Sequence, residues 1–304
     1  MANSVLNAPQ FQTEAAAFAY VEAKLWPTGP ICPFCNSGEK VGRLAGKTTR
    51  PGLCKCYACK KPFTVRMGTI FESSHLALHL WLQVIHLMCA SKKGISTRQI
   101  QRMLDCSMKT AWFLGHRIRE AMNTKTLGPL GGKGVTIEAD ETFIGRKAGM
   151  KLNKPLSEKL SVLSLVERDG HVRSFHVPNV RAETLRAAIA ANVSPKSFFM
   201  TDENRAYTYI GWNFASHQTV NHSEREYVRD DTYTNTVEGY FSILKRGLNG
   251  VYQHVSAAHL QRYLHEFDFR YTNREKRGID DVSRADIALQ GVKGKRLTYR
   301  TTAG

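Results

Sequence analysis

The spacing of hydrophobic and polar positions in this 304-residue chain changes near residue 130. Before that point, apolar side chains recur at helical spacing in residues 8–26, residues 75–91 and residues 96–122, which predicts helices. Beyond it, alternating positions and short apolar runs typical of strands lie between further helical patterns. Residues 127–132 are rich in glycine and separate the two parts. We therefore expect a helical front and an α/β rear joined by a linker.

The rear part alternates strand and helix patterns in an order typical of a mixed sheet with helices packed on it. A hairpin signal, Arg168-Asp169-Gly170, joins two strands within residues 160–177. The other strands are expected at residues 135–145, 197–202 and 217–223, the helices at residues 181–192, 203–210, 234–247 and 257–273, and a basic loop at residues 147–159. Asp140 and Asp202 are each expected at the end of a strand, where open α/β sheets bind ligands.

The front part contains a short helix pattern that begins at Ser96-Thr97, a break at residues 105–107, and a longer helix pattern. This succession is typical of a helix-turn-helix unit, whose second helix enters the major groove of DNA. The residues expected to contact DNA are Lys109, Arg117 and Arg119 on the longer helix. An ordinary three-helix packing unit is the alternative.

Two C-x-x-C motifs, Cys32-Pro-Phe-Cys35 and Cys56-Tyr-Ala-Cys59, are separated by 20 residues. Tetrahedral zinc is bound by four such thiolates, with two supplied by each tight turn, so the spacing predicts a zinc ribbon. The zinc would be structural, because protein ligands fill all four positions. Buried or redox-active cysteines are the alternative, and Cys54 could replace Cys56 as a ligand.

The helix pattern at residues 234–247 has one apolar and one polar side. The apolar side carries Val237, Tyr240, Phe241, Leu244 and Leu248, and the polar side carries Asn235, Glu238, Ser242 and Lys245. A capping box, with Asn235 accepting from the first amides and Glu238 reaching back, would explain two of the polar residues. The functional alternative is a carboxylate and an ammonium aligned on one exposed face.

The formal charge of +17 is unevenly distributed. Residues 1–130 hold 17 Lys and Arg against 6 Asp and Glu, residues 131–273 hold 18 against 16, and residues 274–304 hold 8 against 4. This distribution indicates a polyanion held at both ends of a more acidic centre, with a merely solvated basic surface as the alternative. No apolar run is long enough to span a membrane, and no signal peptide is evident, so we expect a cytoplasmic protein with reduced cysteines.

Three carboxylates, those of Asp140, Asp202 and Glu238, are the candidates for a catalytic centre. Carboxylates that converge repel one another unless cations compensate their charge, so the cluster implies divalent metal, Mg²⁺ or Mn²⁺. Two such ions about 3.5–4 Å apart would serve phosphoryl transfer. Lys245 would contact a phosphate of the substrate.

These motifs together resemble the DDE transposases of bacterial insertion sequences, in the group with an N-terminal zinc ribbon and an ISXO-type, RNase H-like catalytic domain. The resemblance rests on the two C-x-x-C motifs, A-D-E-T-F-I-G around Asp140, T-D-E-N-R-A-Y around Asp202, and T-N-T-V-E-G-Y-F-S-I-L-K-R-G around Glu238. It implies an N-terminal helix (1–27), a zinc ribbon (28–72), a helix-turn-helix region (73–126), an RNase H-like domain (131–275) and a basic tail (276–304).

The resemblance further implies metal-dependent cleavage at transposon ends and transfer of the freed strand to target DNA. The acidic positions of the family carry over to Asp140, Asp202 and Glu238, and its basic position to Lys245. Asn235 is the alternative third metal ligand. The expected partners are double-stranded DNA, at transposon ends and target, and further copies of the chain, with association with the nucleoid. A transposase-derived DNA-binding regulator without catalysis and a structure-selective nuclease of the same fold are the alternative functions.

Overall fold

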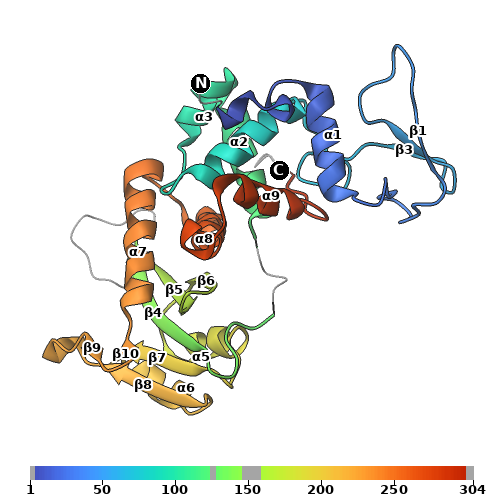
Figure 1. Ribbon diagram of the computed structural model, residues 1–304. Coiled ribbons are helices and arrows are strands. Elements are labelled where there is room, and N and C mark those ends of the chain that lie inside the picture. Colours follow the sequence, from blue (N-terminus) through green and yellow to red (C-terminus); the bar gives the residue numbers. More distant parts are fainter. Residues whose placement is uncertain (1–3, 124–127, 146–158, 299–304) are drawn as a thin grey trace, which may run out of the picture. The chain divides into compact units, whose positions relative to one another are not determined.

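A computed structural model describes residues 4–123, 128–145 and 159–298, and the expected basic loop at residues 147–159 lies almost wholly outside them (Figure 1). The chain forms two compact units. The first contains the described parts of Met1–Ser91, Ile95–Met122 and Ile279–Gly304, and the second contains those of Lys92–Gly94 and Asn123–Gly278. No helix among the described residues is both long and apolar enough to cross a membrane.

Helices and a small antiparallel sheet make up the first unit. Its helices are α1 (Glu14–Leu25), α2 (Leu78–Ala90), α3 (Thr97–Leu104), α4 (Met108–Ala121) and α9 (Asp281–Gln290), with 3-10 turns at Val5–Asn7 and Pro9–Phe11. Its sheet has the order β1 (Val41–Arg43), β2 (Cys54–Cys56), β3 (Pro62–Phe63). This sheet and the cysteine motifs confirm the expected zinc ribbon.

The two helices expected on either side of the break at residues 105–107 form as α3 and α4. Ser96 caps α3 by accepting from the amide of Gln99, and Ser107 caps α4 by accepting from the amide of Thr110. Between the two helices, Asp105 adopts a left-handed conformation with φ of 45°, which ends α3 and turns the chain. Local capping chemistry therefore explains both boundaries.

Helix α9 lies in the segment for which the sequence suggested only a basic tail. It packs against α2, and also against α1 and α4. Asp286 accepts from the Tyr20 hydroxyl and from the Lys24 ammonium at 2.5 Å each, and the Arg284 guanidinium donates to the carbonyl of Cys89. These contacts join the two ends of the sequence within one unit.

A five-stranded mixed sheet with the order β6-β5-β4-β7-β8 forms the centre of the second unit. Its strands are β4 (Thr136–Ile144), β5 (Leu160–Glu167), β6 (Val172–Val177), β7 (Phe198–Asp202) and β8 (Ser216–Val220). The pairs β6–β5 and β5–β4 are antiparallel, whereas β4–β7 and β7–β8 are parallel. The fold is the expected α/β, RNase H-like mixed sheet with flanking helices.

Helices cover the sheet through two separate apolar clusters. One cluster joins the sheet to α5 (Ala182–Ala190) and α6 (Thr208–Gly211), and the other joins it to α7 (Asn235–Gly247) and α8 (Ala257–Thr272). A hairpin of β9 (Val228–Arg229) and β10 (Thr232–Tyr233) precedes α7. The remaining turns are 3-10 at Arg205–Tyr207, His222–Glu224 and Glu275–Arg277, and π-helical at Leu248–Tyr252.

Candidate functional site: a cysteine cluster and an acidic sheet face

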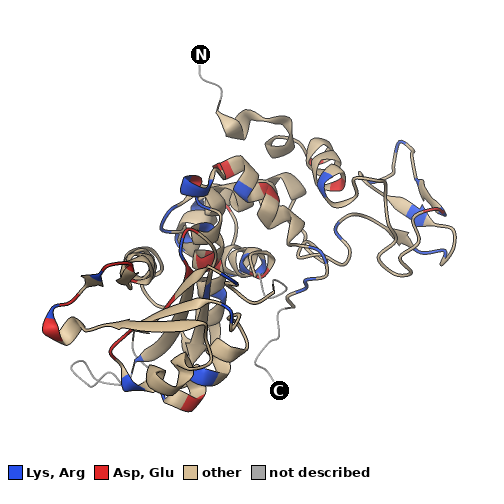
Figure 2. Ribbon diagram, turned by 60° about the horizontal axis from the view of Figure 1, so that its bottom comes forward, with Lys and Arg blue, Asp and Glu red and all other residues tan. Residues whose placement is uncertain are grey.

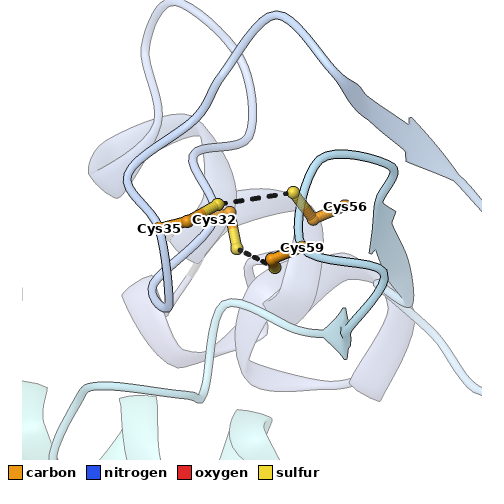
Figure 3. A group of neighbouring side chains, drawn as sticks. All are labelled: Cys32, Cys35, Cys56 and Cys59. Atoms are coloured by element: carbon orange, nitrogen blue, oxygen red, sulfur yellow. Dashed lines mark hydrogen bonds between the residues drawn. The ribbon is translucent and has the colours of Figure 1, made fainter.

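The four cysteines of the two C-x-x-C motifs lie together in the zinc ribbon (Figure 3). Their sulfur atoms are all within 4.8 Å of one another, and the Cys32–Cys59 and Cys35–Cys56 sulfur pairs are each 3.6 Å apart. Four thiol ligands from two tight turns have the chemistry and arrangement of a structural zinc site.

Cys56, rather than Cys54, belongs to this cluster. A hydrogen bond from the backbone of Cys59 lowers the pKa of the Cys56 thiol to about 7, which favours the thiolate that binds metal. Burial instead raises the pKa of Cys54, which keeps that thiol protonated.

Asp140 and Asp202 lie on neighbouring strands, but Asp140 is not at a strand end as expected. It lies in the middle of β4, because β4 continues to Ile144 by pairing with β5. The parallel pairing of β4 with β7 stops at Glu138↔Met200. Continuing that register by two residues places Asp140 level with Asp202 and on the same sheet face. The β4–β7 boundary therefore provides the predicted juxtaposition of two carboxylates.

Electrostatics also indicate that the acidic residues lie close together. Burial, followed by the charges of Asp202 and Glu141, raises the pKa of Asp140 to about 8, and the charge of Glu238 adds to this. Burial likewise raises the pKa of Asp202. In the absence of a cation, the site thus disfavours ionised Asp140, and a divalent cation would reverse that preference.

Glu238 and Asn235 occupy the first turn of α7, and both are exposed. The expected capping box does not form, since the N-cap residue is Thr234 and its side chain makes no capping bond. The Thr234 hydroxyl instead lies 3.2 Å from Oε1 of Glu238, to which it donates. The polar side of α7 is confirmed, because Ser242 and Lys245 are also exposed while the apolar side is buried.

Among the described residues, the four cysteines form the one group of three or more potential metal ligands whose atoms all lie within 4.8 Å. No group of this kind among the described residues includes Asp140, Asp202 or Glu238. A histidine absent from our predictions lies beside them: His222 Nε2 is 3.4 Å from Oε1 of Glu238 and 3.2 Å from the Thr234 hydroxyl. No local sequence signal relates His222 to α7, because β9 and β10 separate them in the chain.

The other acidic residues near the motifs have structural partners. The buried Tyr207 hydroxyl donates to Glu141 at 2.7 Å, on the sheet face opposite Asp140. The amides of His222 and Ser223 donate to Glu203. Glu138, fully buried in β4, accepts from the first turn of α7 and from Arg168. The sequence pattern alone did not identify Glu138 or Arg168.

Two of the three expected DNA contacts are inside the first unit, which corrects that part of the prediction. Arg117 and Arg119 are 5% and 2% exposed, whereas Lys109 is exposed. Arg117 donates to the carbonyls of Ile70 and Glu72 at 2.9 Å each and to that of Leu297 at 3.1 Å. The physical reason is that α4 packs against α2, α3 and α9, so only a narrow part of it is exposed.

The zinc ribbon carries a denser exposed basic surface than α4. Figure 2 shows Lys and Arg positions recurring along its ribbon. The exposed ones are Lys40, Arg43, Lys47, Arg50, Lys60 and Lys61. Two exposed aromatic residues lie within the cysteine motifs, and each has a lysine over its ring: Lys61 over Phe34 at 4.9 Å and Lys55 over Tyr57 at 5.8 Å. Such a surface suits a polyanion.

Comparison with known proteins relates both parts of the chain to mobile elements. Residues 129–272 match the ISXO2-like transposase domain, and residues 12–62 match the transposase zinc-ribbon domain. The chain is also similar to an uncharacterized protein in transposable element ISH50 of Halobacterium salinarum. The two are 28% identical over 284 residues, which is 86% of this chain and 91% of that protein.

Proposed function

This chain belongs to the insertion-sequence transposases that combine a zinc-ribbon domain with an ISXO2-like transposase domain, and on that premise we propose that it cleaves and transfers DNA strands at transposon ends in a metal-dependent reaction. The single observation that carries the proposal is the juxtaposition of Asp140 and Asp202 across the β4–β7 boundary. Glu238 adds a third carboxylate from α7, whose charge acts on Asp140.

Asp140, Asp202 and Glu238 would hold Mg²⁺ or Mn²⁺. Their oxygens are the hard ligands that these ions prefer, and the raised pKa of Asp140 supports a place for cationic charge at this face. Two such ions, when bound, would supply charge compensation for the attacking and leaving oxygens of a phosphodiester. The contribution of the protein is to hold the three carboxylates in place, two of them on neighbouring strands and the third on α7.

Lys245 and Asn235 have auxiliary roles in the proposal. Lys245 lies two turns beyond Glu238 on the same exposed side of α7, from which its ammonium can contact a phosphate of the DNA. Asn235 lies one turn before Glu238 and is the alternative third ligand. Glu238 is preferred because a carboxylate compensates cationic charge and a neutral amide does not.

The first unit would bind the transposon ends. The four-cysteine cluster would hold structural zinc, and the exposed lysines and arginines of the ribbon, together with Lys109 of α4, would contact DNA phosphates. We further propose that the chain acts as a homo-oligomer on paired ends of the chromosomal element.

Strand cleavage and joining would test the proposal directly. The DNA that flanks the gene serves as substrate, with Mg²⁺ or Mn²⁺, and wild type is compared with Asp202→Asn, Glu238→Gln and Asn235→Ala. We expect joining to be lost in the first two variants and kept in the third. Activity lost in Asn235→Ala but kept in Glu238→Gln would assign the third ligand to Asn235.

The same assay separates the alternative functions. Binding to the end DNA without cleavage, with either metal, would indicate a DNA-binding regulator derived from a transposase. Cleavage without joining would indicate a structure-selective nuclease. Either result with wild type would overturn the proposed strand transfer.

A further inference from the structure

The buried carboxylate of Glu138 connects the strand that carries Asp140 to the helix that carries Glu238. Its Oε2 accepts from the amides of Thr236 and Val237 at 2.9 and 3.0 Å. Its Oε1 accepts from the Thr236 hydroxyl at 2.8 Å and from Nε of Arg168 at 2.7 Å. Both oxygens thus accept two hydrogen bonds, so the position of this side chain is fully determined.

Arg168 extends this connection to the segment that leads into α7. Its Nη1 donates to the carbonyl of Asp231 at 2.8 Å, and its Nη2 donates to the carbonyl of Tyr233 at 3.0 Å. The guanidinium also lies over the Tyr233 ring, 3.6 Å from the ring centre. One ion pair, between the buried Glu138 and the partly exposed Arg168, therefore holds β4, the β5–β6 turn, β10 and the first turn of α7.

The Glu138 carboxylate also caps the N-terminus of α7. The first amides of a helix need acceptors from outside it, and a side chain at the N-cap position usually provides one. In α7 that position belongs to Thr234, whose side chain makes no capping bond and donates to Glu238 instead. Because Glu138 satisfies the amides of Thr236 and Val237, the Thr234 hydroxyl is available to orient Glu238.

Glu138 and Asp140 are two residues apart on β4 and so have side chains on the same sheet face. The length and bonding of the Glu138 side chain therefore set how far the first turn of α7 stands from the strand that carries Asp140. We propose that Glu138 and Arg168 are positioning residues that hold Glu238 at the correct distance from Asp140 and Asp202 to share a divalent cation. We call Glu138, Arg168 and their partners Thr236 and Val237 the Glu138 clamp. The effect of the clamp on metal binding rests on the proposed metal-dependent function, whereas the contacts that form the clamp do not.

Hydrogen–deuterium exchange of the full-length, zinc-containing chain tests the geometry without metal or DNA at the acidic site. The variants are Glu138→Gln and Arg168→Lys, read on peptides that cover residues 234–241. We expect exchange in the first turn of α7 to become about ten-fold faster or more, because its amides lose a charged acceptor or the support of that acceptor.

A matched control is Glu266→Gln in α8. Glu266 is also fully buried, and accepts from Arg270 and from the Tyr252 hydroxyl. This variant is expected to lower thermal stability while exchange in residues 234–241 stays at the wild-type rate. If Glu138→Gln does not fold, Thr236→Val removes only the hydroxyl bond to Glu138 and is expected to give a smaller change in the same direction.

The functional consequence is measured as Mn²⁺ affinity, by electron paramagnetic resonance titration of the same proteins. We expect Mn²⁺ to bind about ten-fold more weakly to the clamp variants than to wild type, which is the usual effect of removing a group that orients a metal ligand. Rapid exchange with unchanged Mn²⁺ affinity would show that the clamp is only structural and overturn the proposal, as would unchanged exchange in a folded Glu138→Gln.

The outcomes also distinguish this inference from the proposed function. Wild type that fails to bind Mn²⁺ at all would refute the metal-dependent function, and with it the positioning role. Wild type that binds Mn²⁺ and cleaves DNA, with clamp variants that match it in both, would refute the clamp alone.

Discussion

Replacing Asp140 by asparagine should stabilise the metal-free protein, because the acidic face favours a neutral group at this position. The pKa of Asp140 is raised from 3.8 to about 8 by burial and by the charges of Asp202 and Glu141. Asparagine has nearly the same shape and can still accept from the Glu141 amide, which lies 2.6 Å from Oδ1 of Asp140. The substitution therefore removes the charge and keeps the local contacts.

The sign of the effect follows from proton linkage. Between the pKa values of the unfolded and folded states, native Asp140 holds a proton that the unfolded chain has released, so stability falls as the pH rises through this window. Each pKa unit corresponds to about 1.4 kcal/mol, so a shift from 3.8 to about 8 sets an upper limit of roughly 6 kcal/mol above pH 8. We expect Asp140→Asn to gain about 2–4 kcal/mol at pH 8 and nothing near pH 4.

Calorimetric melting of full-length protein from pH 4 to pH 8.5 measures this difference. No Mg²⁺ or Mn²⁺ is added, because the prediction concerns the metal-free acidic site. No chelator is added either, because it would remove the proposed zinc from the ribbon. The gain corresponds to a rise in melting temperature on the order of 10 °C in the transition of the second unit. Added Mn²⁺ should reduce the advantage of the variant, because the ion would stabilise only the wild type appreciably.

Asp169→Asn is the control, since Asp169 is exposed in the β5–β6 turn and the Lys276 ammonium lowers its pKa. It should give no comparable stabilisation at pH 8. A variant Asp140→Asn that is no more stable than wild type at pH 8, or a gain that persists unchanged to pH 4, would refute the electrostatic reasoning.

Three further results are expected in the first unit. Cys32→Ser should lose bound zinc and weaken DNA binding while the second unit still melts as in wild type, and Cys54→Ser should keep its zinc; normal zinc content in Cys32→Ser would rule out the ribbon site. Arg117→Gln should lower the free energy of unfolding of the first unit by about 2 kcal/mol in a urea titration, because buried carbonyls lose their donor. Lys109→Ala should make DNA binding less dependent on salt concentration, and an unchanged salt dependence would exclude a phosphate contact.

Local sequence patterns were sufficient to predict the features that depend on residues close together in the chain. The two C-x-x-C motifs need only tight turns to present paired thiols, and the structure confirms the cluster of Cys32, Cys35, Cys56 and Cys59. The capped helices α3 and α4 and the two-sided α7 likewise follow from capping residues and helical periodicity. The order of strands and helices was enough to predict a mixed sheet.

The sequence pattern led to wrong predictions about which polar side chains are exposed. Arg117 and Arg119 follow a helical pattern that is compatible with an exposed DNA-reading face, yet α4 is surrounded by other helices, one of them α9 from near the end of the chain. Helix α9 itself lies in the segment described as a tail. Whether a polar side chain faces solvent depends on which elements pack around it, and one element's periodicity does not contain that information.

The sequence alone therefore determined the kinds of element, the cysteine ligand set and the acidic candidates, because each depends on residues close together in the chain. Only the tertiary structure decided the register that brings Asp140 level with Asp202 and the contacts of Glu138 with α7. Those contacts join residues that are 98 and 99 positions apart in the chain. Such pairings are selected by the packing of the whole sheet against its helices, which no single stretch of sequence specifies.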